Sequence, residues 1–451
     1  MENGKSRAGS QKMFTMVGGL RSLKGAERTL NTEPREEIKM TEENVNSAEV
    51  TPEEAIEQGI PAEQEELDLG GIDDLLDISD VPLPPEEVME TVDDEFKQKA
   101  AFKFCFIGAG QGGGRIAHQF WSYGYRRVCA VNTADADLNP LPLPQANKLK
   151  LLGAKEGAGG DPIVGESVAK KNREEVFNLM RNSFGNDFDR IFVCATAGGG
   201  TGAGSCEEIV CIAHELVEKL ELGDEGYSKV GVIIALPKEA DGRDSARSAY
   251  TTVKKLATLA PDLISPIIIV DNQRIEKLYP KTPAGQFWTK ANHAVGSIFH
   301  LLNLVAARES AYTSFDQSDY ESILRSGILA YGAMPVTNWS DRDAISTAIR
   351  DNLTKNVLIG GMDLSTGNIA GCVVVGPKTI LDNELPQEYL DNSFSMLGRM
   401  IRPGSPTRHG VYAGGNGKHL VAYTLIGGLN EPTARLDELK KLGGLIDHDG
   451  A

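Results

Sequence analysis

The sequence predicts an α/β fold in which a Rossmann-like parallel-sheet domain is joined by a long central helix to a smaller α/β C-terminal domain. Three observations support this prediction. From residue 101 onward, short apolar runs alternate with segments of helical length, a pattern typical of parallel sheets with helical crossovers. Two of these runs end at clusters of glycine. Near the middle of the chain, residues 288–310 place apolar side chains at helical spacing over a length too great for a strand.

Five apolar runs are the strands expected in the first domain, residues 101–287. In chain order they read FKFCFIG, RRVCAVN, DRIFVCAT, KVGVIIALP and SPIIIV. Each run is apolar almost throughout, as strands covered by helices on both faces are. Ligands of doubly wound sheets bind at the carboxyl ends of the strands, so the segments that follow these runs are the candidate binding residues.

The second domain is expected at residues 311–430, after the central helix. Its strands read SGILAYGAMPV and AGCVVVG, followed by HGVYAGG and HLVAYTLIGGL. The glycine-rich connection and the alternation of the last two predict an antiparallel pair. Residues 431–451 are expected to be a short polar tail.

The negative charge of the chain is concentrated near its N-terminus. The formal net charge is −18, and residues 41–95 hold 20 acidic side chains and no Lys or Arg. Such a segment cannot bury enough apolar surface to fold, so residues 1–100 are expected to be a disordered acidic extension. One expectation is that the extension is a solvated disordered chain with no specific partner. The alternative is that its stretch LDLGGIDDLLDISDVPLP is a docking peptide for an unidentified protein partner. The charge also argues against direct nucleic-acid binding.

Cysteine usage and hydropathy predict a cytoplasmic location. Six cysteines lie mostly in apolar stretches without CxxC spacing, which indicates free thiols in a reducing compartment. The seven histidines are scattered, so no metal cage of protein side chains is expected. The sequence contains neither a run of about 18 apolar residues nor a signal peptide, and no transmembrane segment is expected.

The first glycine cluster, GAGQGGGRIA, follows the first strand and opens a helix. Main-chain amides at such a junction form an anion site with the helix dipole behind them. Gly108, Gly110 and Gly113 also satisfy the GxGxxG fingerprint, so an NAD-dependent oxidoreductase is one alternative. Against it, the second strand ends in Asn132 and Thr133, where an acidic residue would hold the ribose of NAD.

The second glycine cluster, GGGTGAG, follows a later strand. An ordinary dinucleotide-binding fold does not need a second glycine loop of this kind. It is not a Walker A loop, because no lysine precedes a Ser or Thr at the required spacing. The backbone amides of residues 198–204 and the hydroxyl of Thr201 can instead surround a di- or triphosphate. Two glycine loops therefore predict two cradles for phosphate groups.

The second cluster resembles the tubulin/FtsZ signature GGGTG[ST]G, with Ala203 at the sixth position. AVNTADADL is similar to the FtsZ stretch AVNTDAQAL, and GAGGDPIVG to GAGGNPEVG, whose role in that family is to face the γ-phosphate. The resemblance covers roughly residues 102–430. It implies that the chain binds GTP or GDP, with Mg²⁺ held mainly through the phosphates and water. The nucleotide-binding residues that it implies in these segments are Gly110, Gln111, Gly112, Gly113, Asn132, Thr133, Gly157, Ala158, Gly159, Gly160, Gly198, Gly199, Gly200, Thr201, Gly202, Ala203 and Gly204.

The same resemblance implies contacts for the sugar and the base. In LPKEADGRDSAR, Asp241 takes the place of a sugar-contacting glutamate, and Arg243 or Arg247 substitutes for the family's arginine. Asn272 matches an asparagine that contacts the base. TPAGQFWTKANHAVGS resembles a tubulin stretch, which implies that Trp288 stacks on the purine and Asn292 reads its edge. The alternative is that Trp288 is a core residue at the start of the helix.

In this family, carboxylates of the next subunit complete the active site, and TSFDQSDYESIL stands where FtsZ carries them. The resemblance implies that Asp316 and Asp319 are catalytic. The alternative is that they cap a helix, although capping was expected to need only one of them. The implied protein is a GTPase that forms GDP and phosphate as it polymerises with itself into protofilaments, for cell division or another cytoskeletal task. A non-polymerising nucleotide-binding regulator is the second alternative.

Overall fold

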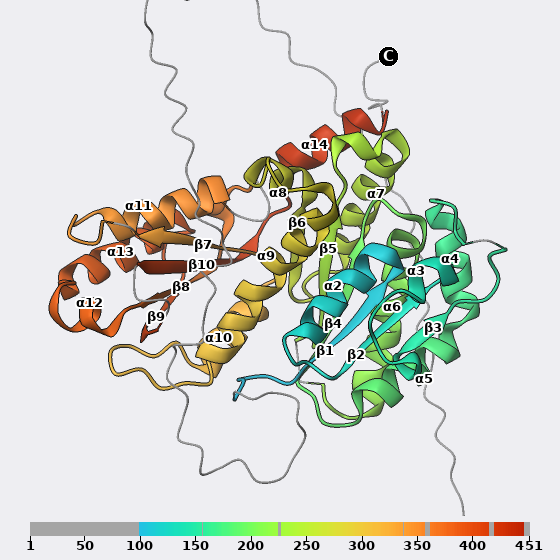
Figure 1. The fold of residues 1–451 in the computed structure, drawn as a ribbon, viewed down its shortest axis with the longest axis horizontal. Helices are drawn as coiled ribbons and strands as arrows, with labels where there is room; N and C mark the ends of the chain where they lie inside the picture. The colour runs from blue at the N-terminus through green and yellow to red at the C-terminus, as the bar shows by residue number, and fades with distance from the viewer. Residues whose placement is uncertain are drawn as a thin grey trace, which may run out of the picture. The chain divides into compact units, whose positions relative to one another are not determined.

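The computed structural model describes residues 99–445 except 156, 224–226, 337, 357–360 and 415–418. The acidic extension and its docking stretch lie outside the described residues. Within the described part, a ten-stranded sheet has the order β3-β2-β1-β4-β5-β6-β7-β10-β8-β9 (Figure 1). The α/β prediction is confirmed.

The first six strands are all parallel, as the continuous apolar runs predict. They are β1 (Phe104–Ala109), β2 (Val128–Asn132), β3 (Lys148–Lys150), β4 (Arg190–Thr196), β5 (Val230–Leu236) and β6 (Ile267–Asp271). The helices between and after them are α2 (Gly110–Ser122), α3 (Asp135–Leu138), α4 (Pro162–Lys171), α5 (Arg173–Phe184), α6 (Gly200–Lys219), α7 (Arg243–Leu259) and α8 (Asn272–Leu278).

The long central helix is α9 (Ala284–Val305), which begins four residues before the expected start and ends five residues before the expected end. The elements that follow are α10 (Gln317–Leu324), β7 (Ile328–Val336), α11 (Ala344–Asp351), β8 (Ile369–Gly376), α12 (Lys378–Asn383), α13 (Gln387–Met400), β9 (Thr407–Ala413), β10 (Leu420–Leu429) and α14 (Thr433–Leu442). None of the described helices is both long and apolar enough to cross a membrane.

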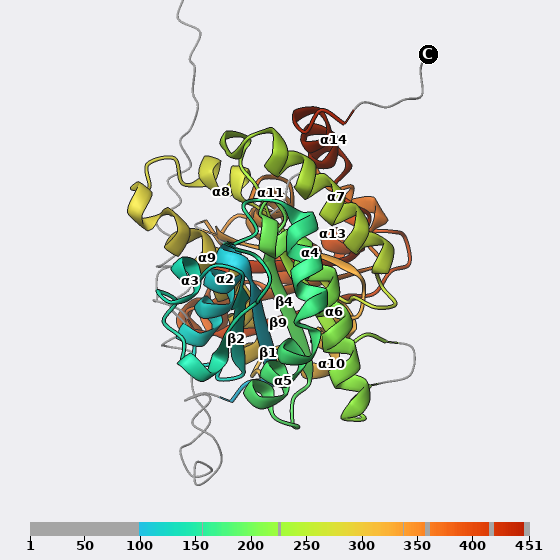
Figure 2. The ribbon, with the colours of Figure 1, turned by 90° about the vertical axis from the view of Figure 1, so that its right-hand side faces the viewer.

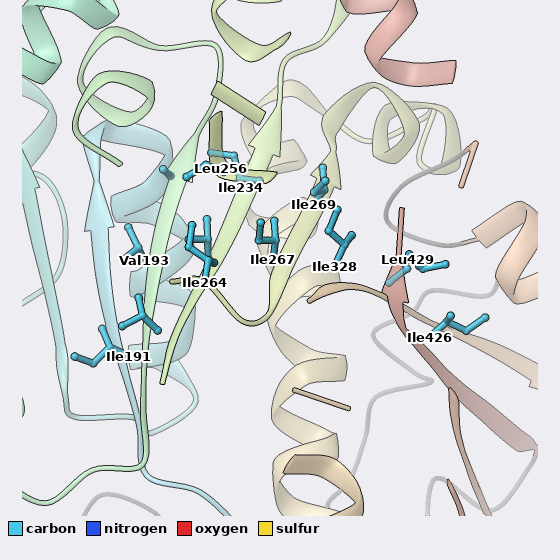
Figure 3. Close-up of a cluster of buried hydrophobic side chains, with 14 of the residues drawn as sticks. Ile191, Val193, Ile234, Leu256, Ile264, Ile267, Ile269, Ile328, Ile426 and Leu429 are labelled. Carbon is cyan, nitrogen blue, oxygen red and sulfur yellow. The ribbon is translucent and has the colours of Figure 1, made fainter. Parts of the chain in front are cut away.

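Alternate residues of each strand face two separate hydrophobic clusters. Phe104 and Phe106 of β1 face the cluster that contains α2 and α9, and Cys105 and Ile107 face the cluster that contains α4 to α7. Figure 2 shows these two helical layers on either side of the sheet. The second cluster continues along the sheet through Ile328 of β7 (Figure 3). Burial on both faces explains why the strands are apolar throughout.

The expected antiparallel pairing of the last two strands is wrong. β10 is antiparallel, but it lies between β7 and β8, whereas β9 pairs in parallel with β8 at the edge. The burial pattern explains the difference. Nearly every residue of β10 is buried, as a strand with two neighbours requires, but the first residues of β9 are only partly buried.

The segment after residue 430 is not simply a polar tail. Residues 433–442 form α14, which packs against α7 through the buried side chains Leu436 and Leu439. Helical periodicity predicts this helix only weakly, because its apolar side consists of two leucines and charged residues surround them.

Close packing between α4 and α6 gives a test of the fold. A Cβ at Gly204 of α6 would overlap the carbonyl oxygen of Pro162 and lie 2.7 Å from the amide nitrogen of Glu166. Because the opposing atoms are backbone, Gly204→Ala is expected to lower the free energy of unfolding by about 1–3 kcal/mol. Chemical denaturation measures this change.

Gly285→Ala in α9 is the matched control, since nothing lies within 4 Å of a Cβ there. It is expected to leave stability unchanged or to raise it by about 0.5 kcal/mol. Equal effects of the two substitutions would contradict the packing described here.

Candidate functional site

A cavity of about 630 Å³ opens at the carboxyl edge of the parallel strands. Its walls come from the segments after β1, β2, β4, β5 and β6 and from the first part of α9. The lining residues are Gly110, Gln111, Gly112, Arg115, Ile116, Asn132, Thr133, Ala134, Asp137, Gly157, Ala158, Gly159, Gly160, Thr196, Gly198, Gly199, Gly200, Thr201, Gly202, Ala235, Pro237, Asp241, Ser245, Asn272, Trp288 and Asn292. The structure thus gathers most of the residues that the sequence singled out.

The two glycine clusters are helix starts rather than free loops. α2 begins at Gly110 and α6 begins at Gly200, so most of each cluster forms the first turns of a helix. Neither helix has a side-chain cap or an acidic residue in its first turn. By contrast, Asp161 caps α4 and Asp271 caps α8. Other described helices, such as α9 and α14, also begin without a side-chain cap. What sets α2 and α6 apart is that their glycine-rich first turns line the cavity, so their free amides can serve as an anion site.

Glycine is required in the walls of the cavity because the backbones of neighbouring segments are in contact there. Gly110 has φ +72°, and a Cβ on it would lie 2.9 Å from the amide nitrogen of Gly202. A Cβ on Gly200 would lie 2.9 Å from the carbonyl carbon of Gly160, in the segment before α4. All three glycine-rich segments therefore pack against one another around the cavity, and side chains would separate them.

Three cluster residues that were expected to bind the nucleotide do not line the cavity. Gly113 packs against the carbonyl oxygen of Cys194 in β4, and Gly204 packs against Pro162 at the start of α4. Ala203 is buried beside them in α6. Their positions in the structure are those of helix-packing residues.

Hydroxyl groups join the segments after β2 and β4. The Thr133 and Thr201 hydroxyl oxygens lie 2.7 Å apart, and the Thr133 hydroxyl also accepts a hydrogen bond of 3.0 Å from the Ala158 amide. The Asn132 side chain accepts a hydrogen bond of 2.8 Å from the Thr133 amide. Thr133 and Thr201 are both buried, and both line the cavity. This network fixes the Thr201 hydroxyl beside the first turn of α6.

The other end of the cavity has an exposed aromatic ring. Trp288 is 39% exposed, whereas the adjacent Phe287 is buried and packs edge-on against it with 5.0 Å between ring centroids. The alternative that Trp288 is a core residue is therefore wrong, because Phe287 fills that place. Asn292 lies one turn further along α9, and Asn272 is the first residue of α8. All three residues line the same cavity.

The expected arginine is not in the cavity. Arg243 lies against Gly444, and its Nε is 3.4 Å from the Gly443 carbonyl oxygen, to which Arg247 also donates at 3.1 Å. Carbonyl groups at the end of a helix lack partners within it, and α14 draws both guanidinium groups to its C-terminus. Asp241, the expected sugar contact, does line the cavity.

Sequence reasoning missed Arg115 and Asp137. Arg115 lies one helical turn after Gln111 in α2, and both line the cavity. Gln111 donates a hydrogen bond of 2.6 Å to Asp137. The spacing of four residues between Gln111 and Arg115 places both side chains on one face of a helix, and this spacing could have identified Arg115 from the sequence. The charged residues in the lining are Arg115, Asp137 and Asp241, so most of the attraction for an anion comes from backbone amides.

Asp316 and Asp319 lie away from this cavity. α10 packs at the amino edge of the sheet, where Glu321 pairs with Arg190 at the start of β4 at 2.9 Å and Ser265 donates to the Leu324 carbonyl. In Figure 1, α10 lies at the end of α9 opposite to α8. Because α9 has 22 residues, the two ends are about 33 Å apart. The carboxylates of Asp316 and Asp319 are therefore too far from the cavity of the same chain to contact a ligand in it.

Both aspartates take part in capping. The Asp316 side chain accepts a hydrogen bond of 2.9 Å from the Asp319 amide, and the Asp319 side chain lies 3.4 Å from the Asp316 amide. This reciprocal capping box uses two carboxylates, so the expectation that capping needs only one is wrong. Asp319 also lies 3.2 Å from Arg408 of β9.

Comparison with known proteins is consistent with this geometry. Residues 103–280 match the family model described as Tubulin/FtsZ family, GTPase domain. These residues therefore resemble the GTPase domain of the tubulin/FtsZ family. The tubulin-like protein TubZ of Bacillus cereus is 26% identical over 255 residues, which cover 52% of this chain and 56% of TubZ. The chain thus aligns with little more than half the length of that relative. Cell division protein FtsZ 1 of Methanocaldococcus jannaschii is 24% identical over 295 residues, covering 63% of this chain and 73% of FtsZ 1.

Solved structures of tubulin/FtsZ-family proteins have the same fold. A GTPγS-form protofilament of TubZ from Bacillus thuringiensis serovar israelensis matches with a TM-score of 0.65 and 19% identity, covering 77% of this chain and 92% of that chain. GTPγS-bound CetZ2 of Haloferax volcanii matches with a TM-score of 0.59 and 22% identity, covering 75% and 98%. The fold that the sequence motifs imply is therefore confirmed.

The cap at Asp316 predicts a pH-dependent loss of stability. Hydrogen bonds from the Ser318 hydroxyl and the Asp319 amide lower the pKa of Asp316 below its ordinary value. This stabilisation is present at pH values above the unfolded-state pKa of about 4 and is lost as the pH falls through the folded-state pKa. Asp316→Ala should therefore cost about 1 kcal/mol of unfolding free energy at pH 7, and less below pH 4.

Asp316→Asn is the control, because asparagine caps helices as well as aspartate does. Urea denaturation at several pH values measures both variants. The capping assignment fails if Asp316→Asn is as unstable as Asp316→Ala at pH 7.

Proposed function

We propose that this protein binds GTP or GDP in the cavity, hydrolyses GTP to GDP and phosphate, and assembles with itself into protofilaments. One observation carries the proposal: two uncapped helix starts, α2 and α6, and an exposed tryptophan line the same cavity. This arrangement fits an anionic chain at one end and a planar base at the other. The TubZ and CetZ2 structures named above are protofilaments in a GTPγS form or with bound GTPγS.

Each part of the nucleotide has partners in the lining. The amides of residues 110–112 and 198–202 and the Thr201 hydroxyl would hold the phosphates. Asp241 would contact the sugar. Trp288 would stack on the purine, with Asn272 and Asn292 at its edge. The described residues contain no group of three or more His, Cys, Asp or Glu side chains placed to hold a metal ion. Mg²⁺ held mainly through the phosphates and water would neutralise part of the phosphate charge.

The position of α10 supports completion of the active site by a second copy. The cavity is at the carboxyl edge of the sheet and the two aspartates are at the amino edge, so head-to-tail stacking places one copy's α10 against the next copy's cavity. Repetition of such a heterologous contact builds a filament. Asp316 and Asp319 would orient a water for attack on the γ-phosphorus, and such positioning is the main contribution of a protein to phosphoryl transfer.

A non-polymerising nucleotide-binding regulator is the second candidate. The capping box favours it, because it gives both aspartates a structural role that needs no hydrolysis. Sedimentation of the purified protein with GTP distinguishes the two candidates, since only a filament former pellets in a nucleotide-dependent way.

The base end of the cavity predicts selectivity for guanine. Asn292 and Asn272 can each donate and accept at the edge of a purine, which differs between guanine and adenine. GTP is therefore expected to bind at least about tenfold more tightly than ATP, or about 1.4 kcal/mol. Calorimetric titration with each nucleotide measures the ratio, and equal affinities would rule out this assignment.

Completion in trans predicts that two inactive variants restore each other. Asp316→Asn keeps the cap and the cavity but removes a carboxylate, and turnover should fall by roughly 10²–10⁴. Gly199→Val places a side chain at the uncapped start of α6, where a Cβ meets nothing closer than 3.5 Å. It should block the phosphates while its α10 remains intact. In a mixture, the cavity of the first variant meets intact aspartates of the second, so GTP turnover should reappear and rise steeply with protein concentration.

A chain that carries both substitutions is the control, because none of its junctions is intact. Gly202→Val would be a poorer partner, since its Cβ would lie 3.0 Å from the carbonyl oxygens of Ala109 and Thr196 and would disturb the strands. If the two variants co-sediment and their mixture shows only the sum of the residual rates, the site is not completed in trans.

A further inference from the structure

A buried arginine of α14 lies behind two residues of the cavity wall, Pro237 and Asn272. Leu436 and Leu439 pack this helix against α7, and the Gly443 carbonyl accepts a hydrogen bond from Arg247. The docked helix turns Arg435 inward, where its side chain is only 7% exposed. A buried guanidinium costs free energy unless it is paired and hydrogen-bonded.

The partners of Arg435 come from the ends of two neighbouring strands. Its Nε lies 3.0 Å from Asp271 Oδ2, and its Nη2 lies 3.2 Å from Asp271 Oδ1. The same Nη2 donates to the Pro237 carbonyl oxygen at 2.9 Å, and Nη1 pairs with Glu438 at the surface. Asp271 is the last residue of β6, and Pro237 directly follows β5. One guanidinium therefore ties the carboxyl ends of β5 and β6 together.

Both strand ends belong to the wall of the cavity. Pro237 lines it directly, and so does Asn272, which follows Asp271. The Asp271 side chain also accepts a hydrogen bond of 3.1 Å from the Gln273 amide and so caps α8 at the point where Asn272 begins it. Burial raises the pKa of Asp271, and Arg435 opposes this by favouring the carboxylate. The carboxylate that caps α8, next to Asn272 in the chain, is thus paired with a residue of α14.

We infer that Arg435 is a positioning residue for recognition of the base, so that selective nucleotide binding requires α14 to be docked. This inference rests on the proposed function, in which Asn272 contacts the purine edge. Arg435 does not line the cavity; it acts through Asp271 and the Pro237 carbonyl, which hold Asn272 in register with Asn292 and Trp288. By linkage, a bound guanine nucleotide in turn stabilises the docked helix.

The test compares Arg435→Lys with Lys441→Met in the full-length protein. Lysine keeps the positive charge, so Asp271 is not left as an unpaired buried charge and the variant is expected to fold. A single ammonium cannot reproduce the planar fork that binds Asp271 through two nitrogens and also reaches the Pro237 carbonyl. Lys441→Met removes a positive charge from an exposed position on the same helix and is the control.

Calorimetric titration with GTP and ATP gives the first result. The GTP-to-ATP affinity ratio is expected to fall from at least about tenfold to below about threefold in Arg435→Lys, and to stay at the wild-type value in Lys441→Met. Amide hydrogen exchange gives the second result. GTP should slow exchange in residues 433–442 of the wild-type protein and have little effect there in Arg435→Lys.

The outcomes separate this inference from the function on which it rests. If the wild-type protein prefers GTP and Arg435→Lys keeps both the preference and the GTP-dependent protection of α14, the positioning role is overturned and the proposed function stands. If the wild-type protein shows no preference for GTP, the assignment of the base site fails and this inference fails with it.

Discussion

The cavity depends on the close approach of two glycine-rich helix starts. β1 and β4 are neighbouring parallel strands, so α2 and α6 begin side by side at one edge of the sheet. Gly110 and Gly202 allow their backbones to meet, and Gly200 admits the segment before α4. Side chains at these positions would separate the helix starts. The amides of α2 and α6 would then no longer converge on one volume, and a multiply charged anion could not reach both.

The rest of the fold holds that junction in place. The sheet is packed on both faces, and the two hydrophobic clusters run along it past the boundary between the two halves. α9 covers one face through residues such as Phe299, and its first turns carry Trp288 and Asn292 into the cavity wall. A single helix therefore links the base end of the cavity to the region of α10. A movement of α9 along its axis would displace residues at both edges of the sheet.

Buried charges occur where segments distant in sequence are joined at the edges of the sheet. At the amino edge, Arg190 of β4 pairs with Glu321 of α10 and donates to the Ser228 carbonyl. At the carboxyl edge, Arg435 of α14 pairs with Asp271 of β6. In each case a guanidinium binds a carboxylate and a backbone carbonyl together, which offsets part of the cost of burying the charge, although the Nε of each arginine makes no hydrogen bond. The two arginines fix α10 and α14 at opposite edges of the sheet.

The sequence by itself determined the strands of the parallel sheet, the central helix and the glycine clusters, because each depends on residues close together in the chain. Apolar runs, helical spacing and glycine density are local signals, and the resemblance of the clusters to the tubulin/FtsZ signature identified the family. Gly110, Thr201 and Trp288 could be named as cavity residues for this reason. The place of β10 between β7 and β8 was decided only by the tertiary structure, since pairing depends on which strand edges remain open. The tertiary structure also decided that α14 docks, that Arg243 turns away from the cavity and that Arg435 lies behind Asn272. These contacts join residues up to 200 positions apart, and no local pattern records which charged side chain a distant backbone carbonyl will attract.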